Sequence, residues 1–131
     1  MDKGKVVGNA LLFDVFKAHA EYGKNRMESI FRDNGIGLFV KYDLKNINRF
    51  IAENHITSVV VFIYDPNHYH QLVSFIALGL KVLVCSSVND IHLKGLEELG
   101  IPFLDMGLPK KELFQEVHAF LLDANTSDAV A

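Results

Sequence analysis

The chain has little that could fix its fold covalently or anchor it in a bilayer. Its 131 residues contain one cysteine, Cys85, so no disulfide can form within the chain. Cys85 follows the apolar run Val82 to Val84, which predicts a buried and unreactive thiol. No apolar stretch approaches the roughly 20 residues that span a membrane, and the first residues do not resemble a signal peptide. We therefore expect a cytoplasmic protein without a membrane partner.

Neither positive nor negative charge is in large excess. The formal net charge is −3, which provides no broad basic surface for DNA or RNA phosphates, so nucleic acid is excluded as an expected partner. Half of the residues are hydrophobic and 22% are charged, as in a compact globular protein. We expect one domain over residues 1–124, followed by a small, polar and flexible tail over 125–131.

What the sequence does contain is an alternation of short β-rich runs and longer runs with helical spacing. The clearest strand, Val59 to Tyr64, is a continuous apolar run, as expected for a strand covered on both faces of a parallel sheet. The other predicted strands lie at 6–13, 36–42, 81–85 and 101–104. Helical spacing is found at 16–34, after Asp43, at 69–78, around 91–99 and after Pro109. We expect Gly35 to end the first of these helices and Asp43 to cap the second. This order predicts an α/β fold with three layers, a doubly wound five-stranded parallel sheet, and strand order 2-1-3-4-5.

Polar residues follow the predicted strands at the edge where such sheets bind ligands. Asp14 and Asp65 each follow a strand, and Ser86 and Ser87 follow another. Two carboxylates and a hydroxyl could hold a divalent cation such as Mg²⁺ together with a phosphoryl group. Aspartate is also common at these positions for purely local reasons, because its side chain caps helices and shapes turns. A structural role for Asp14 and Asp65 is therefore the alternative to a ligand site.

The second half of the chain carries a family resemblance. Residues 80–87, a polar turn and residues 96–104 resemble the fourth strand, fourth helix and fifth strand of response-regulator receiver domains. Residues 109–113 resemble the start of that family's last helix, and the likeness covers most of the chain, best from Val59 onward. The resemblance implies a flavodoxin-like fold and a role in two-component signal transduction.

By position, the resemblance assigns candidate site residues. Asp65 matches the phosphoacceptor, Ser86 or Ser87 the hydroxyl that senses the phosphoryl group, and Asp14 one member of the acidic pair that binds Mg²⁺. Asp14 has no acidic neighbour, however, and the family's lysine after the fifth strand falls at Met106 or Leu108. We therefore expect an atypical receiver or pseudo-receiver, which is not an enzyme and has no resident cofactor.

Such domains act by protein–protein contact through the fourth helix, the fifth strand and the last helix. The partner would be another protein or a second copy of the chain. On this chain that face would present His92, Lys94, Phe103, Asp105, Lys111 and Phe114.

A second resemblance leaves an alternative open. The stretch from His19 to Asn25 is similar to the first loop of cobalamin-binding domains, in which a histidine ligates cobalt and a Gly-Lys pair opens a helix. The pair here would be Gly23-Lys24, although Lys17 stands where that family has an aspartate. This alternative implies a small-molecule binding domain of the same fold with His19 as the cobalamin ligand.

Overall fold

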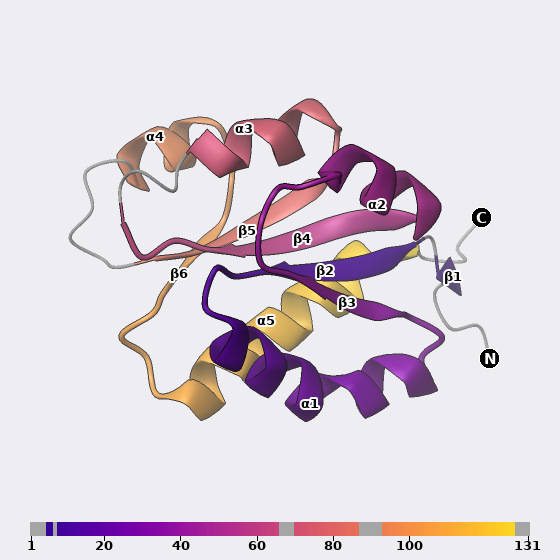
Figure 1. The fold of residues 1–131 in the computed structure, drawn as a ribbon. Helices are drawn as coiled ribbons and strands as arrows, with labels where there is room; N and C mark the ends of the chain where they lie inside the picture. The colour runs from indigo at the N-terminus through magenta and orange to yellow at the C-terminus, as the bar shows by residue number, and fades with distance from the viewer. Residues whose placement is uncertain (1–4, 7, 66–69, 87–92, 128–131) are drawn as a thin grey trace.

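The fold is built on one parallel sheet. The computed structural model describes residues 5–6, 8–65, 70–86 and 93–127 (Figure 1). The sheet has five strands in the order β3-β2-β4-β5-β6, and all neighbouring strands in it are parallel. Their bounds are β2 (Asn9–Phe13), β3 (Leu38–Lys41), β4 (Ile56–Phe62), β5 (Lys81–Ser86) and β6 (Phe103–Asp105). Counted from β2, this order is 2-1-3-4-5, so the predicted topology is confirmed.

The two strands with the strongest apolar runs lie side by side in the centre. Val60 pairs with Leu83, and Val61 pairs with Val84, in parallel register. All four side chains are buried. Because successive side chains of a strand point to opposite faces, a strand with no polar alternation must be covered on both sides. The continuous apolar runs in the sequence therefore correctly predict a sheet with helices on both faces.

Helices cover both faces of the sheet. Figure 1 shows α1 (Lys17–Asp33) and α5 (Lys110–Ala124) on one face, and α2 (Ile47–Glu53), α3 (His70–Ala77) and α4 (Leu93–Glu98) on the other. Alternate residues of each central strand join one of two cores. The core under α1 and α5 includes Leu12, Val60, Phe62, Met27, Phe31, Phe114 and Val117. The core under α2, α3 and α4 includes Leu11, Phe13, Val61, Ile51, Phe75 and Leu96.

Two helix boundaries show how local chemistry sets the ends of elements. Gly35 follows α1 with a φ of 77°, in the left-handed region that glycine adopts without strain, so the predicted stop is confirmed. The prediction that Asp43 caps the second helix is wrong. The Asp43 carboxylate instead accepts the Lys45 N–H at 3.1 Å in a local turn, and α2 begins at Ile47 after Asn46.

The folded domain extends further toward the C-terminus than predicted. Asn125, expected in the flexible tail, is buried. Its Oδ1 accepts the Thr57 hydroxyl at 2.8 Å, and its Nδ2 donates to Ser58 Oγ and to the Leu121 carbonyl. Next, β7 (Thr126–Ser127) pairs antiparallel with β1 (Lys5–Val6) in a small second sheet. The structure therefore places Asn125 in the domain, because burial with three hydrogen bonds outweighs its polar character. Residues 128–131 lie outside the described residues.

Among the described residues, none of the helices combines the length and the apolar character that crossing a membrane requires.

Candidate functional site

Asp14 is the centre of the candidate site. It directly follows β2, and its side chain is fully buried. Its Oδ1 accepts the Phe16 N–H at 2.9 Å. Its Oδ2 accepts the Tyr64 hydroxyl at 2.9 Å and also contacts His19 Nδ1. Three protein groups therefore use the oxygens of this carboxylate, which is how a buried charge is normally stabilised.

His19 lies in the first turn of α1 and is held on several sides. Its ring packs edge-on against Phe62, with ring centres 4.9 Å apart, and lies 5.6 Å from the ring of Phe114. The Tyr64 oxygen is 3.0 Å from Nδ1. Because Asp14 is the strongest acceptor nearby, the proton of the neutral imidazole belongs on Nδ1, which leaves Nε2 as the ring's acceptor.

Tyr64 connects the ends of two neighbouring strands. It follows β4, and its hydroxyl donates to Asp14 at the end of β2. Burial raises the pKa of the Tyr64 phenol well above its ordinary value of 10.0, and the charge of Asp14 raises it further. The phenol therefore stays protonated and remains a hydrogen-bond donor. Its ring also makes an edge contact with Phe16, at 4.5 Å between ring centres, and Phe16 is 55% exposed.

Asp65 lies in a different environment from Asp14. It is exposed, one residue after Tyr64. Within the described part of the chain, no group of three or more histidine, cysteine, aspartate or glutamate side chains is placed to hold a metal ion. The predicted pairing of the two aspartates around Mg²⁺ also meets a chemical obstacle. The oxygens of Asp14 already accept hydrogen bonds from the protein, so a cation would have to displace them.

The predicted hydroxyl residue and the predicted lysine position lie on neighbouring strands. Ser86 is buried at the end of β5, and its carbonyl accepts the Met106 N–H at 2.9 Å. Ser87 lies outside the described residues. Met106 and Leu108 are partly buried and pack on the core under α1 and α5. The position at which receivers carry a cation is therefore apolar and turned toward the core.

The predicted partner face is only partly available. Phe114 is 3% exposed and packs against α1, so its placement on that face is wrong. Phe103 is partly buried against the other core, and Asp105 accepts the Gly107 N–H at 2.7 Å. Lys111 is exposed. His92 and the side chain of Lys94 lie outside the described residues.

The cobalamin resemblance meets the structure at His19 and Gly23. His19 has a carboxylate partner, but that partner is Asp14, five positions earlier. Gly23 does not open a helix, because it lies inside α1. A Cβ at Gly23 would come within 2.7 Å of the Phe114 ring, so this glycine allows close packing of α1 on α5. The Gly-Lys part of the resemblance therefore has a packing explanation.

Sequence reasoning missed the link between Asp14, His19 and Tyr64. The strand pattern identifies Tyr64 only as the end of a strand, and the family resemblance identifies His19 only as a candidate cobalt ligand. The available signal was a tyrosine at the end of one central strand and an aspartate at the end of the neighbouring strand, which share one edge of the sheet.

Comparison with solved structures shows which proteins share this fold. The N-terminal domain of the nisin resistance regulator NsrR, a lantibiotic response regulator, aligns with a TM-score of 0.61 at 13% identity, covering 87% of this chain and 97% of that one. The receiver domain of the Francisella response regulator 1452 aligns with a TM-score of 0.60 at 20% identity, covering 88% and 98%. A de novo designed Rossmann 2x3 fold protein aligns with a TM-score of 0.66 at 17% identity, covering 94% and 96%.

The chain therefore has the flavodoxin-like fold of response-regulator receiver domains. Because one fold can host many unrelated functions, these likenesses show the fold and no activity. No protein-family model matches the sequence, and no curated protein matches it.

Proposed function

We propose that this chain is a non-enzymatic signalling module of the receiver type that works without the usual phosphorylation chemistry and acts by protein–protein contact. The observation that carries the proposal is that the Asp14 carboxylate is buried and already hydrogen-bonded within the protein. A receiver needs free carboxylate oxygens to hold Mg²⁺ beside the phosphoacceptor, whereas this carboxylate is buried and bonded to Phe16, Tyr64 and His19.

The residues at the lysine position support the same proposal. A phosphorylated aspartate gains stability and a signal when a nearby cation pairs with the phosphoryl oxygens. Met106 and Leu108 cannot form such a pair, and both pack on the core. A phosphoryl group on Asp65 would therefore find an apolar side chain, and not a cation, at positions 106 and 108.

Phosphorylation is tested by incubating the protein with acetyl phosphate and Mg²⁺ and measuring the intact mass. The expected result is no Mg²⁺-dependent phosphoryl adduct on the wild-type chain. Asp65→Asn removes the candidate acceptor, and Asp33→Asn is a matched control at an exposed aspartate in α1. An adduct that disappears in Asp65→Asn but persists in Asp33→Asn would show a working phosphoacceptor and overturn the proposal.

Protein–protein contact is tested on the partner that the wild-type chain captures, including a second copy of itself. Binding should survive Asp65→Ala, and it should weaken in Lys111→Glu, which reverses an exposed charge at the start of α5. A partner lost in Asp65→Ala would instead connect binding to the phosphoacceptor position.

Cobalamin binding is the second candidate, and one observation favours it. A carboxylate that holds Nδ1 of a histidine fixes the ring and leaves Nε2 for a metal, as Asp14 does for His19. The test is the absorption spectrum of hydroxocobalamin mixed with the protein. Binding requires a spectral change that is lost in His19→Ala, whereas an unchanged spectrum ends this candidate.

A further inference from the structure

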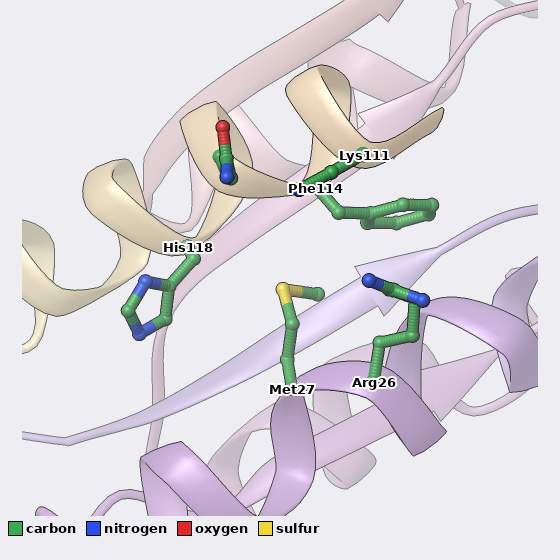
Figure 2. A pocket seen from close by; sticks show the side chains of 6 residues that line it. Arg26, Met27, Lys111, Phe114 and His118 are labelled. Atoms are coloured by element: carbon green, nitrogen blue, oxygen red, sulfur yellow. The ribbon is translucent and has the colours of Figure 1, made fainter. Parts of the chain in front are cut away.

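A pocket lined by residues of two helices has a chemistry that the proposed function does not use. It lies between α1 and α5, encloses about 130 Å³, and is bordered by Arg26, Met27, Lys111, Phe114, Gln115 and His118 (Figure 2). At roughly 30 Å³ per water molecule, this space holds about four waters. It therefore suits a small ion or a compact polar group, since sites for drug-sized ligands are several times larger.

Two cations, Arg26 and Lys111, border this pocket, and Arg26 shares the ring of Tyr22 with Lys110. The Arg26 guanidinium lies 5.6 Å from the centre of the Tyr22 ring, and Lys110 Nζ lies 4.6 Å from the same centre. Among the described residues, none of these three cations forms an ion pair, although Glu112 lies next to Lys111 in the sequence. Like charges that share one site repel each other unless an anion joins them.

The aromatic rings explain how the cations are held in place without an acid. Tyr22 and Phe114 lie 5.6 Å apart, and Phe114 is buried between α1 and α5. Cation–π attraction to Tyr22 orients Arg26 and Lys110 but leaves their charge uncompensated. Figure 2 shows the Arg26 guanidinium beside the Phe114 ring, with Met27 between Arg26 and His118.

We infer that this pocket binds a small tetrahedral oxyanion, namely phosphate or the phosphate group of a small monoester. Arg26 supplies a planar fork that matches two oxygens, Lys111 supplies a second charge, and the Gln115 amide supplies a neutral donor. Two cations match the double charge of a phosphate monoester better than the single charge of a carboxylate. Buried Met27 and Phe114 give the organic part of a monoester an apolar surface.

The inference is tested by titrating the folded chain with inorganic phosphate, and separately with glycerol phosphate, at constant ionic strength set with chloride. The readout is the set of backbone amide shifts of α1 and α5 in two-dimensional NMR spectra. Saturable shifts at Gln115 and Met27 are expected with both probes. Arg26→Gln and Lys111→Gln should each weaken binding about tenfold, because each removes one charge-assisted contact.

A control variant makes the result specific. Arg49→Gln removes one positive charge on α2, on the other face of the sheet, and should leave binding unchanged. Shifts that do not saturate, or that fall equally in Arg49→Gln and Arg26→Gln, would reveal nonspecific screening and overturn the inference.

Discussion

The hydroxyl of Tyr64 donates a hydrogen bond to the carboxylate of Asp14 across 50 positions of sequence, at 2.9 Å. This bond joins the ends of the two strands between which the strand order of the sheet reverses. In folds of this type, ligands bind in the crevice at that reversal. Here the protein's own donors use the acidic group of the crevice, which is why we propose signalling without the usual phosphorylation.

The first prediction concerns the stability that Asp14 confers. Asp14→Ala should lower the free energy of unfolding by about 3 kcal/mol, because it leaves the Tyr64 hydroxyl and His19 without their buried acceptor. Urea unfolding followed by circular dichroism measures this loss. Asp33→Ala, at an exposed site, should change stability by less than about 0.5 kcal/mol. Equal effects of the two variants would show that Asp14 is not a structural centre.

The second prediction concerns pH and Tyr64. Burial and the charge of Asp14 raise the pKa of the folded Tyr64 phenol above its value of 10.0 in a free chain. A raised pKa stabilises the fold fully below pH 10, and this contribution is lost as the pH rises further, because the unfolded chain then releases a proton that the folded chain keeps. The unfolding free energy of the wild type should therefore fall above about pH 10.

Tyr64→Phe provides the comparison, because it removes the titrating group but keeps the ring. Its unfolding free energy should fall less steeply than that of the wild type over the same alkaline range. Two parallel curves would show that the phenol does not titrate differently in the folded and unfolded chains.

The third prediction concerns Cys85, the only thiol of the chain. It is fully buried in β5, and burial, followed by the charge of Asp14, raises the pKa of the thiol well above 9.0. Only the thiolate is nucleophilic, so a folded chain should react very slowly with a disulfide reagent at pH 8. Reaction should become fast in denaturing urea. Equally fast labelling of the native protein would show that β5 opens readily.

The fourth prediction concerns Asn125. Asn125→Ala should destabilise the fold by about 1–3 kcal/mol, because the buried Ser58 hydroxyl loses the Asn125 amide donor and Thr57 loses its acceptor. Asn48→Ala is a matched control at an exposed position of α2. Thermal or urea unfolding distinguishes the two variants. An Asn125→Ala protein as stable as the control would show that Asn125 does not stabilise the domain.

The architecture was predictable because it depends on local patterns. Continuous apolar runs such as Val59 to Ile63 mark strands that are buried on both faces, and the runs between them show helical spacing. The burial of Asn125 was not predictable in this way, since its side-chain partners Thr57 and Ser58 lie 68 and 67 positions earlier. Polar residues near the end of a chain are usually solvated, and only the tertiary contacts reverse that expectation.

The position of the candidate site was predictable from the sequence, but the hydrogen-bond partners of Asp14 were not. The sequence located Asp14 at the correct edge of the sheet, whereas its partners His19 and Tyr64 depend on how α1 and β4 pack. The prediction for Phe114 was wrong for a different reason, namely that it followed the family resemblance and not the residue pattern. It belongs to the apolar stripe of α5, so periodicity places it inside, and the analogy with a partner face was the weaker guide.

The pairing of β1 with β7 brings the two ends of the described chain together, with Lys5 opposite Ser127. In Figure 1 they meet beside the start of β2, at the far end of the sheet from Asp14. The backbone is therefore almost a closed ring. Joining its ends with a short linker and cutting it in an exposed turn, such as the one around Gly79, should give a circularly permuted chain with the same sheet.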